Sequence, residues 1–350
     1  MQADCRTMWR IAGHDEAVTL LSRSLEKEKL SHAYLFAGPP RVGKATLAMI
    51  LAQGVNCLAD TGERPCGECS QCLRIAAGQH PDVQVVDLAS AQSPTRREIG
   101  IDQVREVQRA AALKPFEGRR RVFIFPDAPS LSTEASNALL KLLEEPPDSV
   151  LLLLLTTQAD AILPTIRSRC QLVELGRLPV EAIAEELTRS RGVAQDEAES
   201  LARLSGGSIG WAMEASARPE VLQEYTEELE RVAALLGEGL EGRFAWAEET
   251  ASLYARDRER ALLRLRTALG WWRDLLALKE GGDALVSNTP ALESMRRHAG
   301  WVASSQAVEA VGRIREAISH LEANVNPRLA LEVMVLGLPR GAAQAERKAV

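Results

Sequence analysis

A glycine-rich segment near the N-terminus constrains the fold more than any other feature of this sequence. It lies within Ala33–Leu47, AYLFAGPPRVGKATL. The first five residues are apolar and suit a buried strand, and an Ala-, Leu- and Met-rich helix is expected after the turn, to about Gly54. Gly38 and Gly43 enclose four residues and precede Lys44, so the turn fits G-x-x-x-x-G-K, the phosphate-binding loop. The expected strand before the loop and helix after it support this interpretation and predict an α/β fold.

The loop has the chemistry of a nucleotide site, with one departure. Its glycines let several backbone N–H groups point inward, and the N-terminus of the following helix adds positive potential. Lys44 is expected to reach the terminal phosphates of ATP or ADP, but Ala45 replaces the Ser or Thr whose hydroxyl holds Mg²⁺. The candidate nucleotide-binding residues are Gly38, Pro39, Pro40, Arg41, Val42, Gly43, Lys44, Ala45 and Thr46. We expect a nucleotide pocket without a fully competent ATPase; an empty pocket and an ordinary Gly-rich turn are the alternatives.

The composition excludes several classes of protein. With 350 residues, of which 46% are hydrophobic and 26% charged, the chain is expected to be soluble and to form two or three domains. Its longest apolar run, Val150–Leu155, suits a buried strand and is too short to cross a membrane. The start, MQADCRTMWR, lacks the apolar region of a signal peptide, so we expect a cytoplasmic protein with no membrane partner. A net charge of −6 argues against a large DNA-wrapping surface.

Four of the six cysteines lie in one polar segment, CLADTGERPCGECSQC. The spacing C-x8-C-x2-C-x2-C predicts that Cys57, Cys66, Cys69 and Cys72 hold a tetrahedral Zn²⁺. The segment is too polar and turn-rich to bury a core, so the metal would supply its folding energy. Four thiolates close the coordination shell and leave no position for water, which predicts a structural site. Four unrelated thiols and a redox C-x-x-C pair are the alternatives.

Strands and helices alternate through the first half of the chain. The expected strands are Ala33–Ala37, Val83–Leu88, Arg121–Phe125 and Val150–Leu155, and the expected helices are His14–Lys29, the helix after the phosphate loop, Asp102–Leu113 and Ser132–Leu143. This alternation indicates a parallel sheet that helices cover on both faces.

The third expected strand ends at Pro126 and Asp127. A P-loop enzyme carries an Asp for the Mg²⁺ shell at this strand end, followed by a Glu that orients the attacking water. Here a proline takes the first place and a shorter carboxylate takes the second. We therefore interpret Asp127 as part of an ordinary turn.

Several stretches together resemble the bacterial clamp-loader subunits of the AAA+ class, and in particular the family of delta-prime subunits of DNA polymerase III. The matching stretches are Leu30–Thr46 (LSHAYLFAGPPRVGKAT), the four-cysteine segment, Asn137–Pro147 (NALLKLLEEPP), Ile166–Gln171 (IRSRCQ) and Asn324–Leu331 (NVNPRLAL). They follow the family's order along the chain. NALLKLLEEPP and the SRC tripeptide are specific to clamp loaders, whereas the phosphate loop alone is not.

The resemblance implies an α/β plus all-α fold. It consists of an AAA+ P-loop core with a five-stranded parallel sheet, a small helical lid and a C-terminal helical collar that closes a pentameric ring. We expect the core at 1–175 with the zinc insert at 57–72, the lid at 176–215, the collar at 216–338 and a disordered tail at 339–350. Within the collar, Trp271 and Trp272 are expected to pack a helix bundle rather than to stack on bases.

The resemblance also assigns a role to Arg169, the arginine of the SRC tripeptide, as a finger that reaches the ATP of a neighbouring subunit. A guanidinium at the γ-phosphate offsets charge in the transition state, an effect on the order of 10³–10⁵ in rate in other NTPases. Taken alone, an Arg in a loop is more often a solvated surface residue or an ion-pair partner. In the lid, where motor subunits carry an arginine within GSxR, this chain has Gly210.

Ala45, Pro126 and Gly210 together predict a subunit that hydrolyses nucleotide poorly or not at all and has no chemistry of its own. By resemblance, it joins the motor and delta subunits in the polymerase holoenzyme, offers Arg169 to a neighbour, and helps to load the sliding clamp onto primer–template DNA during replication. The alternative within the family is the ATP-hydrolysing motor subunit, tau or gamma. That subunit carries intact GKT/S and DE residues and a longer C-terminal extension.

A hypothesis from another class is a DNA-binding module that acts through the four-cysteine segment. Such a module needs basic and aromatic residues beside its ligands. The segment instead offers Asp60, Glu63, Glu68 and a single arginine, Arg64.

Overall fold

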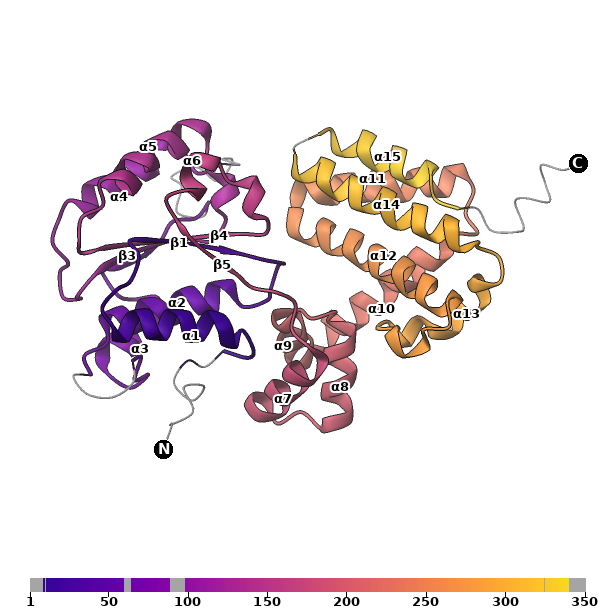
Figure 1. Ribbon diagram of the computed structural model, residues 1–350. Coiled ribbons are helices and arrows are strands. Elements are labelled where there is room, and N and C mark those ends of the chain that lie inside the picture. Colours follow the sequence, from indigo (N-terminus) through magenta and orange to yellow (C-terminus); the bar gives the residue numbers. More distant parts are fainter. Residues whose placement is uncertain (1–8, 10, 60–63, 89–97, 324, 340–350) are drawn as a thin grey trace, which may run out of the picture. The chain divides into compact units, whose positions relative to one another are not determined.

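The computed structural model describes residues 9, 11–59, 64–88, 98–323 and 325–339, which fall into two compact units (Figure 1). The first unit contains the described residues up to Glu186 together with Gly207–Gly210. The second contains Leu187–Gly206 and the described residues from Trp211 onward. The separation of a lid at 176–215 from a collar at 216–338 stays a prediction. The tail that is predicted to be disordered lies outside the described residues from position 340 onward.

The first unit is built on a five-stranded parallel sheet, as the resemblance implies. In spatial order its strands are β2 (Val83–Val85), β3 (Arg121–Phe125), β4 (Val150–Thr156), β1 (Ala33–Ala37) and β5 (Gln171–Glu174). All neighbouring strands run parallel. Ala37, the last residue of β1, lies opposite Thr156 of β4 on one side and Glu174 of β5 on the other. The segment that follows β1 therefore leaves the sheet at its carboxyl edge, between two other strand ends.

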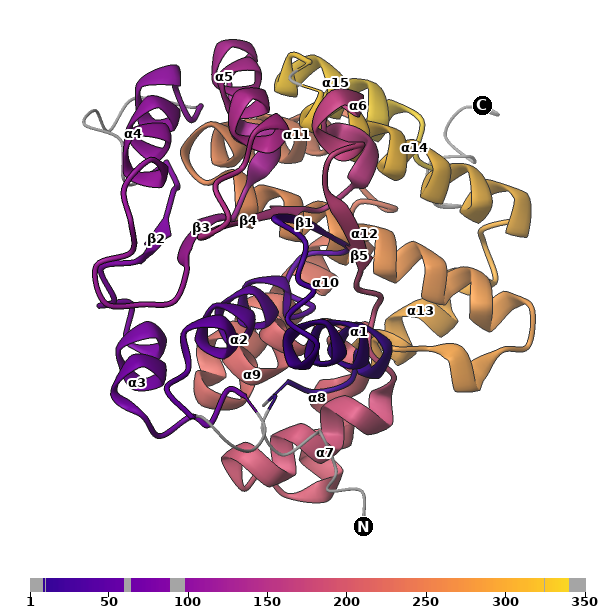
Figure 2. The same ribbon diagram turned by 60° about the vertical axis from the view of Figure 1, so that its left-hand side comes forward.

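Helices cover both faces of this sheet (Figures 1 and 2). One face carries α1 (Asp15–Glu26), α2 (Lys44–Asn56) and α3 (Ser70–Ala76), and the other carries α4 (Ile101–Ala111), α5 (Thr133–Glu144) and α6 (Pro164–Arg167). Every residue of β4 is buried, with Leu153 in the cluster beneath α1 and α2 and Leu154 in the cluster beneath α4 and α5. The apolar run in β4 is explained by this burial on both sides.

Four of the strands lie where the sequence predicts them, although β2 ends at Val85 rather than Leu88. The sequence analysis does not predict β5. Only Val173 of its four residues is buried, so the strand lacks the alternation of apolar and polar residues that would reveal it. An edge strand this short has too few inward-facing residues to produce a recognisable alternation. The fifth strand is expected only from the resemblance, which implies a five-stranded sheet.

The second unit is helical. Its helices are α8 (Gln195–Leu204), α10 (Pro219–Ala234), α11 (Leu240–Arg256), α12 (Arg258–Lys279), α13 (Leu292–Ala299), α14 (Ser304–Glu322) and α15 (Pro327–Leu336), while α7 (Val180–Arg191) and α9 (Ile209–Ala217) cross the division between the units. Trp271 and Trp272 are buried in one core cluster, which confirms that they pack a bundle. Across the described ranges, no helix combines the length and apolarity that a bilayer crossing requires.

A buried arginine secures the C-terminal helix of the second unit. Arg243 of α11 is 1% exposed, and its guanidinium donates to the backbone carbonyl oxygens of Val335 (3.2 Å), Leu338 (2.7 Å) and Pro339 (2.5 Å). These carbonyls belong to the end of α15 and the residues after it, where few backbone N–H groups remain to satisfy them. The cation also lies at the negative end of the helix dipole.

Replacing Arg243 with Met is expected to destabilise the second unit, because the three carbonyl oxygens at the end of α15, together with that of Glu238, lose a charged donor. Each such loss costs about 1–3 kcal/mol, and partial solvation of the helix end reduces the sum to about 2–4 kcal/mol. Chemical denaturation followed by tryptophan fluorescence measures this change in the free energy of unfolding.

Arg328→Met is the matched control, since this arginine on α15 is exposed and pairs with Glu332 (2.8 Å) and Glu248 (3.3 Å). Its loss is expected to leave the free energy of unfolding nearly unchanged, because ion pairs between exposed side chains contribute little. Equal stability of the two variants would contradict the role given to Arg243.

Candidate functional site

The phosphate loop begins with a close contact between two backbone segments. The N–H of Gly38 donates to the carbonyl oxygen of Thr156 over 3.2 Å, and the N–H of Leu175 donates to that of Ala37 over 2.8 Å. A Cβ on Gly38 would lie 2.0 Å from the carbonyl oxygen of Leu175, so only glycine fits there. Gly43 has a φ of +110°, which other residues rarely adopt. The two glycines of the motif are thus required for different reasons: Gly38 by the close approach of another backbone segment, and Gly43 by its positive φ.

The lysine of the loop is turned inward. Lys44 is buried at the start of α2, and its Nζ donates to the carbonyl oxygens of Gly38 (2.6 Å) and Pro39 (2.7 Å). The ammonium therefore lies at the anion-binding end of the helix, where a phosphate would be cradled. A phosphate that enters this loop must compete with the two carbonyl oxygens for the lysine.

Gly210, at the position where the motor pattern has an arginine, lies directly against the loop. Its N–H donates to the carbonyl oxygen of Arg41 over 2.8 Å. A Cβ on Gly210 would lie 3.0 Å from both the Cβ and the carbonyl oxygen of Arg41. Arg41 itself has a φ of +59°. A long side chain at position 210 would therefore require the loop or its neighbour to shift.

The positions that complete a Mg²⁺ shell in P-loop enzymes carry no such ligand here. Ala45 is exposed at the start of α2 and offers only a methyl group. Pro126 follows β3 directly and has no side-chain oxygen. Asp127 is exposed, and its carboxylate accepts a hydrogen bond from the hydroxyl of Ser130 within the next turn. Asp127 thus lies in a strand-end turn, as the sequence analysis interprets it.

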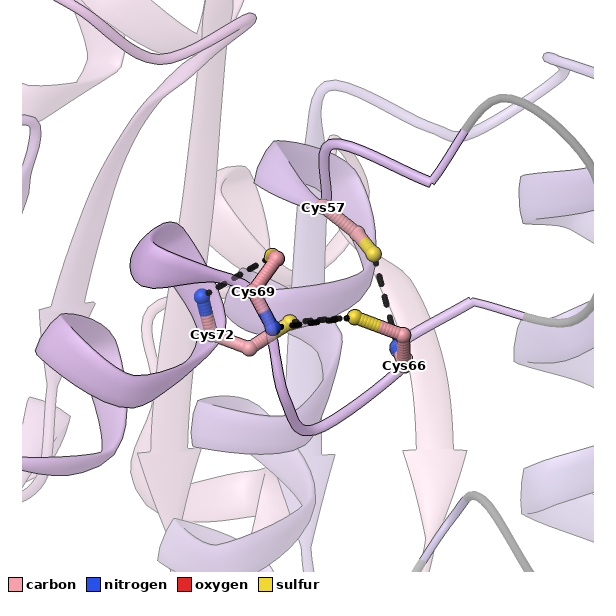
Figure 3. Close-up of side chains that lie close together, drawn as sticks. All are labelled: Cys57, Cys66, Cys69 and Cys72. Atoms are coloured by element: carbon pink, nitrogen blue, oxygen red, sulfur yellow. Dashed lines mark hydrogen bonds between the residues drawn. The ribbon is translucent and has the colours of Figure 1, made fainter.

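The four cysteines of the polar segment converge on one point (Figure 3). Cys57 follows α2, Cys69 caps α3 and Cys72 lies inside that helix, which the sequence analysis does not predict. The four sulfur atoms all lie within 4.8 Å of one another, and those of Cys66 and Cys72 are 4.0 Å apart. Around a tetrahedral Zn²⁺ with bonds of about 2.3 Å, sulfur atoms are separated by about 3.8 Å. The donor set therefore fits a tetrahedral metal ion.

Backbone N–H groups point at the thiols. Cys66 donates to the Sγ of Cys57 (3.4 Å), Cys69 to that of Cys66 (3.3 Å) and Cys72 to that of Cys69 (3.5 Å). Burial raises the pKa of Cys57 and of Cys72. Burial alone also raises the pKa of Cys69, but hydrogen bonds from the backbone N–H groups of Leu58 and Cys72 lower it to about 6. A metal ion would displace the remaining protons, because thiolates are its ligands.

The cysteine cluster and the phosphate loop lie at opposite ends of α2. Lys44 is the first residue of this helix and Cys57 follows its last residue. The helix has 13 residues, and at about 1.5 Å per residue the two sites are about 20 Å apart. A metal held by the cysteines therefore takes no part in phosphate chemistry at the loop.

Arg169 lies between α6 and β5 and belongs to neither site. Its Nη2 pairs with the Oε1 of Glu144 at the end of α5 over 2.7 Å, and its Nη1 donates to the carbonyl oxygen of Thr165 over 3.0 Å. The side chain remains 37% exposed. The sequence analysis does not identify Glu144 as its partner. The one feature of the sequence that relates Glu144 to Arg169 is that both belong to stretches that resemble clamp loaders.

Comparisons with known proteins connect these features to replication proteins. The family described as "DNA polymerase III, delta subunit" matches residues 13–179. DNA polymerase III subunit delta' of Bacillus subtilis is 29% identical over 325 residues, which cover 92% of this chain and 95% of that protein. DNA polymerase III subunit gamma/tau of Mycobacterium tuberculosis is 30% identical over 351 residues, which cover 93% of this chain. The chain spans 59% of the length of that gamma/tau subunit.

Among solved structures, a DNA polymerase III gamma subunit-related protein of Thermotoga maritima is similar to this chain with a TM-score of 0.45. The two share 21% sequence identity, and the similarity covers 92% of this chain and 98% of that one.

Proposed function

We propose that the chain belongs to the family of DNA polymerase III clamp-loader subunits and acts as its delta-prime member. In this role it is a ring subunit that hydrolyses nucleotide poorly or not at all and lends Arg169 to a neighbouring ATPase subunit. It thereby helps to load the sliding clamp onto primed DNA during replication. The match to subunit delta' over nearly the full length of both chains supports this choice.

The observation that carries the proposal is the different placement of two cationic side chains. Lys44, in the phosphate loop, is buried against the loop's own carbonyl oxygens, whereas Arg169 is partly exposed at the surface. Neither Ala45 nor Pro126 can hold the Mg²⁺ that bridges the phosphates in P-loop enzymes. A bound ATP or ADP would therefore not be hydrolysed efficiently, and the proposal also holds for an empty pocket.

The geometry around Arg169 supports its role as a finger. A guanidinium has five N–H donors in one plane. Glu144 and the carbonyl of Thr165 each engage one end of that plane and so restrict the orientation of the side chain. Because the group stays partly exposed, it can bind phosphate oxygens that another subunit presents.

We assign a structural Zn²⁺ to Cys57, Cys66, Cys69 and Cys72. Four thiolates favour zinc over Mg²⁺ or Ca²⁺, which take oxygen ligands. Four protein ligands also close the tetrahedral shell, so no position remains for water or substrate. The proposed task of the metal is to hold the polar segment that connects α2 to α3.

The proposed partners are the motor and delta subunits in a pentameric ring and, through that ring, the sliding clamp and primer–template DNA. We propose the cytoplasm as the site of action. The alternative is that the chain is the motor subunit. That alternative requires an intact Mg²⁺ shell, and Ala45 and Pro126 do not provide one.

The isolated chain is expected to show no ATP hydrolysis above that of its Lys44→Ala variant. The reason is that both protein ligands of the Mg²⁺ shell are absent, so even a bound nucleotide lacks its metal bridge. Phosphate release from ATP measures the rate. Turnover at rates typical of AAA+ motors would refute this role and favour the motor subunit.

Arg169→Ala is expected to leave the chain folded and able to join its partner subunits. In the reconstituted loader, hydrolysis at the one site that Arg169 faces should fall by about 10³ or more. Total hydrolysis should fall only partly, because the other sites use other arginines, while clamp loading should be strongly impaired. Lys at this position should not restore the rate, because one ammonium cannot reproduce the planar contacts of guanidinium.

Arg167→Ala is the matched control for this experiment. Arg167 lies two positions away and pairs with the exposed carboxylate of Asp160. Its removal is expected to leave both hydrolysis and clamp loading unchanged. An Arg169→Ala complex that hydrolyses ATP and loads clamps as fast as the Arg167→Ala complex would remove the finger role.

Purified, reduced protein is expected to contain one equivalent of zinc, measured by elemental analysis. Cys69→Ser should lose the metal, because three thiolates leave the tetrahedral shell open. The segment from Cys57 to Cys72 should then loosen while the parallel sheet stays folded. Cys170→Ser serves as the control, since Cys170 lies outside the cluster and should not affect the zinc content. A zinc content far below one equivalent in the unaltered protein would contradict the assignment.

A further inference from the structure

The loop that joins α4 to β3, residues 112–120, turns its largest apolar side chains toward solvent. Leu113 is 62% exposed and Phe116 is 81% exposed. Because these side chains bury only a minor part of their apolar area, they give the loop little hydrophobic anchorage. The order of the loop therefore depends on polar contacts made beneath it.

A buried carboxylate holds the centre of this loop. Asp82, directly before β2, accepts hydrogen bonds from the backbone N–H groups of Phe116 (2.8 Å), Glu117 (2.9 Å) and Gly118 (2.8 Å). Its Oδ1 also lies 3.2 Å from the guanidinium of Arg121. Burial alone raises the pKa of this carboxyl, but these donors and the guanidinium outweigh burial and lower the pKa below its usual value. The charged carboxylate is a strong acceptor for the loop.

Two further anchors of the loop are sequence neighbours of the cysteine ligands. Asn56, which immediately precedes the first cysteine of the cluster, is fully buried and its Oδ1 accepts the N–H of Arg120 over 2.9 Å. Gln71, which immediately precedes the fourth cysteine, is also buried, and its Nε2 donates to the carbonyl oxygen of Glu117 over 3.4 Å. The loop thus contacts one residue from each end of the four-cysteine segment.

Helix α3 makes additional contacts with the same loop. Arg74 of α3 forms an ion pair with the carboxylate of Glu117. The Oε1 of Gln71 contacts the Nε2 of His80, whose Nδ1 accepts the backbone N–H of Asp82 over 3.1 Å. The helix therefore reaches the loop directly through Glu117 and indirectly through Asp82.

We propose that the four-cysteine segment, when it holds its metal, positions loop 112–120, an inference that rests on the proposed metal site. Helix α3 has only 7 residues, and isolated helices shorter than about 12–15 residues are marginal in water. Its place therefore depends on tertiary contacts, which are made by the buried Ile75 and by Cys69 and Cys72. The metal joins these two to Cys57 and so fixes Asn56 and Gln71 relative to each other. Loss of the metal lets α3 and Gln71 move relative to Asn56, so the loop, which Asp82 still holds at its centre, opens more often.

Hydrogen–deuterium exchange on the full chain tests this coupling. Zinc-bound protein is compared with protein stripped by a chelator under reducing conditions, and the zinc content is measured on the same samples. Exchange of the N–H groups of Phe116, Glu117, Gly118 and Arg120 is expected to become about tenfold faster on stripping, because the loop opens more often when Gln71 no longer holds it in place against Asn56. The N–H groups of β1 and β4 are the internal reference and should not change.

A variant separates the metal from its effect on the loop. The double substitution Asn56→Ala and Gln71→Ala is expected to keep one equivalent of zinc, while its loop exchanges about as fast as that of the stripped protein. Leu73→Ala is the matched control, because Leu73 lies on the same helix and is 56% exposed. Its loop should exchange as in the unaltered protein.

Two further outcomes decide against the proposal. Unaltered protein without zinc overturns the metal site and this inference together. A zinc-loaded double variant whose loop exchanges at the unaltered rate overturns the inference alone. This second outcome decides the question even if stripping unfolds the first unit, which loss of protection in β1 and β4 would reveal.

Discussion

The backbone contact at Gly38 is the constraint on which the first unit depends. At the end of β1 the chain must pass so close to Leu175 that a Cβ would lie 2.0 Å from its carbonyl oxygen. This close passage lets the chain turn between the ends of β4 and β5, in a sheet that helices cover on both faces, and start α2 directly after the turn. The position of Lys44 at the helix N-terminus, and of Cys57 beyond its C-terminus, follows from that turn.

Two cations in this unit have opposite surroundings, and the difference defines the proposed function. The ammonium of Lys44 is satisfied inside its own loop, next to positions that offer no metal ligand. The guanidinium of Arg169 is oriented by Glu144 but remains accessible. A subunit with this arrangement is suited to act on a nucleotide held by a neighbour rather than on its own.

The cysteine cluster lies beyond the C-terminal end of α2, at the opposite end of the helix from the phosphate loop. Asn56 and Gln71 are each adjacent to a cysteine of the cluster, and both contact the loop after α4. Together with Asp82 they replace the hydrophobic anchorage that the exposed Phe116 does not provide. In the proposed coupling, a metal held by the cluster acts beyond its own segment, because it constrains the residues that flank its ligands.

The sequence by itself determined what depends on local spacing. The glycines and lysine of the phosphate loop, four strands and the four converging thiols are all short-range patterns, and each lies where the sequence predicts it. The edge strand β5, the pairing of Arg169 with Glu144 and the contacts of Asn56 and Gln71 with a loop far along the chain were decided only by tertiary structure. Their partners are distant in sequence, and a side chain's periodicity or spacing carries no information about which distant backbone the packed sheet and helices will bring within hydrogen-bonding distance.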